Sequence, residues 1–229
     1  MAEVETFLAR QSFGSKLFYR IMHTIVVGVV MAYTRTKVVG RHNIPKHGPY
    51  VLAPIHRSNI DTPLAAAVTA RRLRFMGKDS LWKFGPIGWI LSALGAFPVT
   101  RGTADREALK RCIAVLENGE PLVLFPEGTR QFGPQVMPLF DGAAYVAVKA
   151  GVPIVPLGIG GSEKVMPKGK KMIYPHKCVL VVGEPIVVKR DDTGRVPRSG
   201  VKEMTEVLSV ELQRLFDEAQ RLAGTPNKA

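Results

Sequence analysis

Cysteine is scarce in this sequence. Its two cysteines, Cys112 and Cys178, lie far apart in the chain and form no CxxC pair. A disulfide framework and a cysteine-ligated zinc site are therefore not expected, and reduced thiols in a cytosolic setting fit better. Both cysteines stand among apolar residues, which favours small buried side chains over reactive thiols.

Acidic residues are also few. The 229 residues include 32 Lys and Arg but only 19 Asp and Glu, which gives a formal net charge of +13. Such an excess indicates an anionic partner: nucleic acid, an acidic membrane or a phosphorylated substrate. Aromatic residues make up only 7% of the chain and no nucleic-acid-binding motif is recognised, so the sequence argues against nucleic acid.

The sequence lacks a standard signal peptide and an apolar run long enough to cross a bilayer. Its most apolar stretch, residues 21–33, has thirteen residues, whereas a spanning helix needs about 20. We therefore expect residues 1–39 to form an N-terminal membrane-associated helical segment, peripheral or monotopic on the cytoplasmic face of the cell membrane. A spanning helix and a buried core helix are the alternatives. Five basic residues favour contact with anionic lipids: Arg10, Lys16, Arg20, Arg35 and Lys37.

Residues 40–229 contain no repeat and alternate short apolar runs with helical patterns. This alternation is typical of a single α/β domain with a mixed, largely parallel sheet flanked by helices. Strands are expected over residues 50–54, 74–77, 96–99, 122–125, 154–159 and 178–182. Helices are expected over residues 62–68, 106–117, 141–149 and 201–222, and a helix or amphipathic hairpin broken by Gly85-Pro86 over residues 82–94.

Polar segments follow three of the expected strands, and the first of them contains His56 and Asp61. In such sheets ligand sites gather at the carboxyl ends of the strands. If the turn between the two residues folds back, Asp61 can accept the proton of one ring nitrogen, and the other nitrogen can act as a general base. The alternative is structural, with His56 closing the sheet and Asp61 capping a helix.

The other two polar segments each carry an arginine. Phe125–Arg130 contains a glycine, which permits close backbone approach, and Arg130, whose planar guanidinium suits a phosphate. Glu127 in this segment needs a partner, and Arg130 or Thr129 could serve. Arg101, in the segment that follows the strand expected over residues 96–99, would add a second cation to a phosphate clamp. Taken singly, each segment could equally be an ordinary surface turn.

Four motifs in this order resemble the glycerolipid acyltransferase family, and more closely its lysophosphatidate acyltransferases. They are the HxxxxD motif from His56 to Asp61, a G-x-[IF]-x-[VI]-x-R block from Gly95 to Arg101, the FPEGTR block at Phe125–Arg130, and the proline-framed strand Val152–Pro156. The similarity extends over about residues 40 to 190. It implies a fatty acyl transfer to the free hydroxyl of lysophosphatidate, which gives phosphatidate for phospholipid synthesis.

The resemblance also implies a role for each motif. His56 would deprotonate the acceptor hydroxyl, which attacks the thioester of acyl-CoA or an acyl-carrier protein, and Asp61 would orient His56. The thioester is already activated, so neither a metal nor a cofactor is expected. The backbone N–H of Gly128 or a neighbour would stabilise the oxyanion. The glycerol phosphate would be bound by Arg130, in a loop shaped by Glu127, Gly128 and Thr129, with help from Arg101 and Lys78.

One departure from the family pattern affects the acceptor. Where relatives often have Phe-Lys-x-Gly, this chain has Leu139-Phe140-Asp141-Gly142 and no lysine. The acceptor could therefore be another lysophospholipid or a glycolipid. A non-catalytic basic membrane-binding module is a further alternative, whereas the absence of a Gly-x-Ser-x-Gly elbow argues against an esterase.

Overall fold

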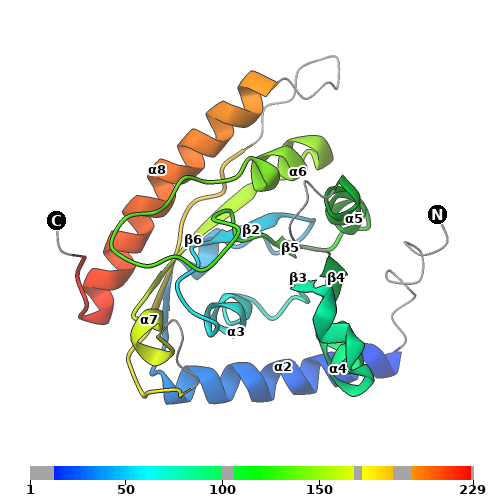
Figure 1. The fold of residues 1–229 in the computed structure, drawn as a ribbon, viewed down its shortest axis with the longest axis horizontal. Coiled ribbons are helices and arrows are strands. Elements are labelled where there is room, and N and C mark those ends of the chain that lie inside the picture. Colours follow the sequence, from blue (N-terminus) through cyan, green and yellow to red (C-terminus); the bar gives the residue numbers. More distant parts are fainter. Residues whose placement is uncertain (1–12, 100–105, 168–171, 188–197, 228–229) are drawn as a thin grey trace.

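The computed structural model describes residues 13–99, 106–167, 172–187 and 198–227. A seven-stranded sheet with the order β1-β7-β6-β2-β5-β3-β4 forms the centre of the molecule (Figure 1). Neighbouring strands run parallel except β6 and β7, which pair antiparallel. The mixed, largely parallel sheet expected from the sequence is thus confirmed. The strands are β1 (Lys37–Val39), β2 (Val51–Pro54), β3 (Arg74–Lys78), β4 (Ala96–Val99), β5 (Leu122–Val123), β6 (Ile154–Gly160) and β7 (Val179–Val182).

Helices cover both faces of this sheet. Figure 1 shows α5, α6 and α8 on one side and α2, α3 and α4 on the other. The α-helices are α2 (Phe13–Tyr33), α3 (Asp61–Ala66), α4 (Gly85–Ala93), α5 (Arg106–Glu117), α6 (Gly142–Ala150), α7 (Ser162–Val165) and α8 (Arg198–Ala223). The 3-10 turns are η1 (Arg41–Asn43) and η2 (Asp79–Lys83).

Residues 82–94, expected to be broken near Gly85-Pro86, are divided between η2 and α4. Phe84 between them is extended, and Pro86 lies in the first turn of α4. The strand β1 lies within the segment expected to precede the domain, yet it pairs with β7 as the outermost strand of the sheet. The N-terminal segment therefore contributes to the fold of the sheet.

The helix α8 packs closely against β6. Every residue of β6 is buried, and two glycines in it, Gly158 and Gly160, face the α8 backbone. A β-carbon at either position would collide with the carbonyl oxygen of Leu215 or Ala219. Glycine in this strand therefore serves close helix–sheet packing. This packing holds α8 beside the loops that follow β2 and β5.

The helix α2 has two different sides. It buries Tyr19 and Val27 against the rest of the protein. On the other side, large apolar residues recur every four positions and stay exposed: Leu17, Ile21, Ile25, Val29 and Tyr33. Among the helices in the described ranges, none combines the length and apolarity needed to cross a membrane.

Candidate active site

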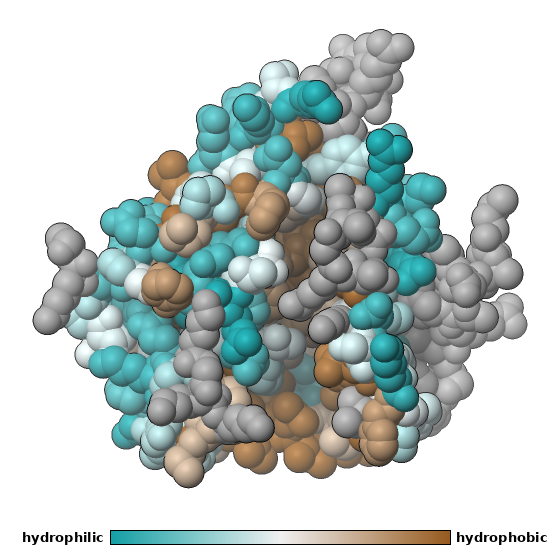
Figure 2. Space-filling model, viewed as in Figure 1, coloured by the Kyte–Doolittle hydropathy of each residue, from teal (hydrophilic) through white to brown (hydrophobic). Residues whose placement is uncertain are grey.

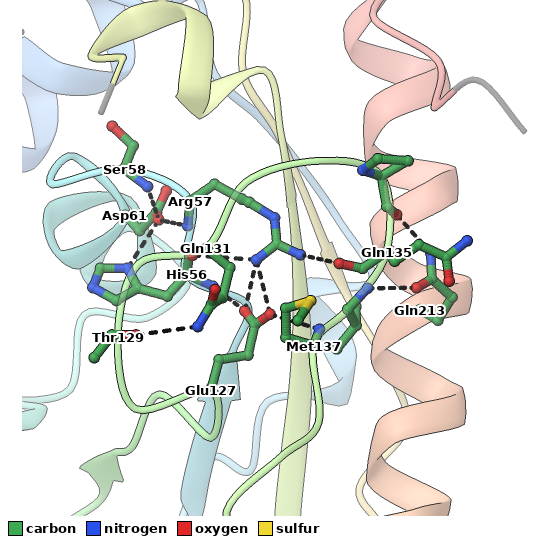
Figure 3. A network of polar contacts seen from close by, with 12 residues as sticks. His56, Arg57, Ser58, Asp61, Glu127, Thr129, Gln131, Gln135, Met137 and Gln213 are labelled. Carbon is green, nitrogen blue, oxygen red and sulfur yellow. Dashed lines mark hydrogen bonds and ion pairs between the residues drawn. The ribbon is translucent and has the colours of Figure 1, made fainter. Parts of the chain in front are cut away.

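His56 and Asp61 meet just beyond the carboxyl end of β2. The Asp61 side chain is fully buried, and its Oδ2 atom lies 3.1 Å from His56 Nδ1. The same oxygen accepts hydrogen bonds from the backbone N–H groups of Arg57 and Ser58, each at 2.6 Å (Figure 3). The predicted fold-back of the turn is confirmed, because these two bonds wrap the chain around the carboxylate.

The contact with Asp61 sets which nitrogen of the His56 ring carries the proton. An ionised carboxylate only accepts hydrogen bonds, so His56 places its ring proton on Nδ1 and keeps the lone pair on Nε2. The ring also stacks on Phe125, with centroids 4.1 Å apart. The side chain remains 16% exposed. His56 is therefore held in one orientation with a basic nitrogen on the side away from Asp61.

His56 lines a cavity of about 660 Å³ that has polar and apolar walls. The polar members come from the segments that follow β2 and β5: His56, Asn59, Thr62, Thr129 and Arg130. The apolar members come mainly from β3, η2, α4 and β4: Phe75, Met76, Leu81, Trp82, Leu91 and Ala96. The cavity therefore suits a molecule with a polar head and an apolar chain.

Arg130 lies on the wall of the same cavity as His56. It is half-buried, and within the described part of the chain its guanidinium forms no hydrogen bond or ion pair. Gly128 and Thr129 are exposed beside it, and Gly128 has a φ of 69°, where a side chain would also meet the Phe140 ring. A guanidinium that is not already paired can bind an anionic ligand group.

The partner of Glu127 is neither Arg130 nor Thr129. Its carboxylate is buried and accepts bonds from Arg57 Nη1 at 2.8 and 2.9 Å, and from the backbone N–H groups of His56 and Met137. Glu127 thus shapes the loop through Arg57, which the sequence reasoning did not single out. The sequence feature that could have indicated Arg57 is its position directly after His56, at the end of a buried strand.

The structure narrows the choice of oxyanion donor among the backbone N–H groups of Gly128 and its neighbours. The Gly128 N–H donates to the carbonyl oxygen of Phe125 at 3.0 Å, and the Thr129 N–H donates to that of Glu127 at 2.7 Å. Both groups are engaged within the turn. The backbone N–H of Arg130 has no such partner among the described residues and is the neighbouring group left to donate.

The side chains of two expected phosphate-binding residues are not placed by the structure. Arg101 lies outside the described residues. Lys78 ends β3, in register with Val99 of β4, but the direction of its side chain is not described. Their roles in binding phosphate stay predictions. Within the described ranges, no group of three or more His, Cys, Asp or Glu side chains could hold a metal ion, and the expected independence from metals and cofactors stays a prediction.

The cysteines are buried, as their apolar surroundings predicted. Both Cys112 and Cys178 are fully buried. Burial raises the pKa of Cys178 to about 12, and the negative charge of Asp61 makes a smaller contribution in the same direction. Because the thiolate is the nucleophilic form of cysteine, Cys178 is inert at neutral pH.

A sequence model described as "Acyltransferase" matches residues 35–160, which is more than half of the chain. The chain belongs to the acyltransferase family. The match includes the His56–Asp61 turn and the Arg130 loop, so the residues that line the cavity lie within the family's shared region.

Named members of the acyltransferase family are similar to this chain. It is 30% identical to the chloroplastic 1-acyl-sn-glycerol-3-phosphate acyltransferase of Brassica napus, over 71% of this chain and 48% of that protein. It is 29% identical to the Bacillus subtilis 1-acyl-sn-glycerol-3-phosphate acyltransferase, over 81% of this chain and 90% of that protein. The chain thus spans about half the length of the chloroplastic relatives and most of the bacterial one.

A solved structure supports the fold. The crystal structure of the 1-acyl-sn-glycerophosphate (LPA) acyltransferase PlsC from Thermotoga maritima matches with a TM-score of 0.69 and 26% identity. The match covers 90% of this chain and 87% of that one. The α/β architecture of this acyltransferase is therefore shared with that enzyme along nearly the whole chain.

Proposed function

We propose that this acyltransferase moves a fatty acyl group from acyl-CoA or an acyl-carrier protein to the free hydroxyl of lysophosphatidate. One observation carries the proposal: an oriented histidine, His56, and an arginine without a partner among the described residues, Arg130, line one cavity whose other walls are apolar. A lysophosphatidate has the matching groups, namely a hydroxyl, a phosphate and an acyl chain. The names of the relatives point to the same acceptor.

The geometry supports a direct transfer. His56 Nε2 takes the proton of the glycerol hydroxyl while the hydroxyl oxygen attacks the thioester carbonyl carbon. When the tetrahedral intermediate collapses, the C–S bond breaks, and the proton passes from His56 to the leaving thiolate. Asp61 stabilises the imidazolium that forms between these steps. Base catalysis of this kind contributes about 10²–10⁴-fold, so orientation and oxyanion stabilisation must supply the rest.

Labelled acyl-CoA together with a thiol reagent tests this function. Thiol release and labelled phosphatidate that both depend on lysophosphatidate are expected. Thiol release without any acceptor would indicate hydrolysis, and no release would indicate a binding module. A panel with other lysophospholipids and a glycolipid tests the alternative acceptors. That panel is warranted because Asp141, in the segment without the expected lysine, instead accepts a hydrogen bond from Thr205 of α8.

Replacing Arg130 with alanine is expected to raise the acceptor KM by about 10- to 100-fold, with a smaller change in kcat. The reason is that a hydrogen bond to a charged group is worth about 1.5–3 kcal/mol. Steady-state kinetics with lysophosphatidate as the varied substrate measures the effect. Arg214→Ala removes an exposed arginine of α8 and is the matched control. A change confined to the KM of the acyl donor would contradict the assignment of the phosphate site.

The apolar side of α2 supports a peripheral or monotopic position on an anionic membrane. Its exposed stripe continues into α4, where Trp89 is 63% exposed and its ring lies 5.2 Å from that of Phe18. At the other end, Tyr33 Oη donates to the carbonyl oxygen of Ile173, which belongs to an exposed apolar segment. Figure 2 shows apolar side chains gathered along this lower face. The basic residues Arg20 and Arg35 are exposed beside them.

Introducing two aspartates into this stripe, as Ile25→Asp with Val29→Asp, is expected to weaken partitioning to anionic vesicles at least about tenfold. Each change removes about 1.5–3 kcal/mol of apolar burial and adds a repelled charge. Co-flotation with liposomes measures the partitioning. Val210→Asp is the control, because Val210 is 73% exposed on α8, away from α2 in Figure 1. Unchanged flotation of the double variant would place membrane contact elsewhere.

A further inference from the structure

The Arg57–Glu127 ion pair is buried beside the proposed base. Arg57 is 1% exposed, as is Glu127, and Arg57 Nη1 reaches both carboxylate oxygens. The guanidinium also lies over the ring of Phe216 in α8, 4.8 Å from its centroid. A buried ion pair stabilises a fold little, because removing two charges from water costs about as much as their attraction returns. We therefore look for the role of this pair in the position that it gives to neighbouring backbone atoms.

This pair and its loop hold the backbone of His56 from both sides. The His56 N–H donates to Glu127 Oε2 at 2.9 Å. The His56 carbonyl oxygen accepts from the Gln131 N–H at 2.8 Å and from Arg57 Nη1 at 3.3 Å. These bonds fix the backbone position from which the His56 ring extends to Asp61 (Figure 3).

The same atoms connect His56 to the phosphate loop. The Gln131 N–H belongs to the peptide bond directly after Arg130, so a movement of Arg130 shifts a donor to His56. The far side of this loop is braced by α8. Arg57 Nη2 donates to the carbonyl oxygen of Gln135 at 2.9 Å, and Gln213 of α8 accepts from the Val136 N–H at 2.7 Å.

We propose that Arg57 is a positioning residue that couples the phosphate loop to the base, so that phosphate bound at Arg130 completes the alignment of His56. The proposal rests on the function proposed above. It has a kinetic consequence, because binding energy from the phosphate then accelerates the chemical step as well as holding the acceptor. An acceptor without phosphate, a monoacylglycerol, should have a lower kcat. Inorganic phosphite added to that reaction should restore part of it.

A charge-neutral replacement separates positioning from stability. In Arg57→Met alone, Glu127 is left charged and buried, so both the melting temperature and kcat should fall. In the double variant Arg57→Met/Glu127→Gln, the charges are gone and the glutamine still offers an acceptor to the His56 N–H. Its melting temperature should return near that of the parent. Its kcat should remain about 100-fold low, as misplaced catalytic groups produce, with little change in the acceptor KM, and phosphite should no longer activate.

The chain offers a control in a second ion pair, in which Arg74 is buried and Glu120 is half-buried. Arg74 Nε lies 2.7 Å from Glu120 Oε2, at the opposite end of the sheet strands. Arg74→Met/Glu120→Gln should change the melting temperature without changing kcat or the response to phosphite. Arg57→Lys, which keeps the charge but loses the planar fork, should recover part of kcat.

Two results would overturn the coupling. They are an unchanged kcat in Arg57→Met, and a kcat that returns with the melting temperature in the double variant.

A readout independent of turnover distinguishes failure of the coupling from failure of the proposed function. NMR of ¹⁵N-labelled histidine in the parent should show phosphite shifting the His56 signals, and the shift should be lost in the double variant. A parent that shows the shift but transfers no acyl group to lysophosphatidate would reject the acceptor alone, and a parent without the shift would reject the coupling.

Discussion

Replacing His56 with alanine is expected to lower kcat for acyl transfer by about 10²–10⁴-fold, the usual contribution of a positioned general base. The structure holds the His56 ring through Asp61 at one nitrogen and through stacking on Phe125, and leaves its other nitrogen for the acceptor. Nothing else in the cavity wall combines a free basic atom with this orientation: apart from His56, its described polar members are Asn59, Thr62, Thr129 and Arg130. Transfer of labelled acyl groups under saturating substrates measures the loss.

The His56→Ala variant should keep its fold and its recovery on vesicles, because the side chain it loses is not part of the apolar core. His47→Ala is the matched control, since His47 is an exposed histidine in a bend. Circular dichroism and flotation check the fold and the membrane contact. Turnover within a few-fold of the parent would show that another group takes the proton, and the mechanism proposed here would then be abandoned.

Asp61→Asn is expected to lower kcat by up to about 10⁴-fold, the cost of the corresponding change in a serine protease triad. Asp61 Oδ2 serves His56 Nδ1 and two backbone N–H groups together. The oxygen of an amide can take the place of Oδ2 and keep these three bonds, with its NH₂ group in the place of Oδ1. The variant then lacks the negative charge that stabilises the His56 imidazolium during the transfer.

The role of the Asp61 charge can be checked separately from the orientation of His56. The acceptor KM should stay close to that of the parent, because Asp61 is buried and does not line the cavity. Histidine NMR should report the His56 proton on Nδ1 in both the variant and the parent, because the amide oxygen takes the place of Oδ2. Glu117→Gln, at an exposed position in α5, controls for losing a negative charge. An Asp61→Asn variant that keeps more than about a tenth of kcat would argue that the charge of Asp61 matters little.

Much of the fold could be predicted because its central strands are continuously buried. β2 and β6 are apolar along their whole length, and such runs between turn residues indicate strands whatever surrounds them. The helix α5 begins and ends where its sequence pattern predicted. β5 is shorter than expected, because only Leu122 and Val123 keep the ladder pairing and the chain then turns into the site. Local pattern does not encode where such a ladder stops.

The partner of Glu127 could not be predicted, because it lies 70 residues away in the sequence. Arg57 and Arg130 are chemically equal candidates in the sequence. The sheet decides between them, since β2 and β5 are neighbours and place the segments after them side by side. Burial then excludes water from the Arg57–Glu127 pair and leaves Arg130 on the cavity wall. The side of α2 that faces the protein is settled in the same way, by packing against α3 and α4.

The sequence by itself determined which chemical groups are present: a histidine and an aspartate in a short turn, an arginine in a glycine-containing loop, an excess of basic residues and a largely parallel α/β sheet. These follow from residue type and spacing, which act locally along the chain. The tertiary structure alone decided which charges are paired and which remain free. That outcome depends on contacts between residues distant in sequence and on which of them are removed from water. Here it buries Arg57 with Glu127 beside His56 and places Arg130 on the wall of the cavity.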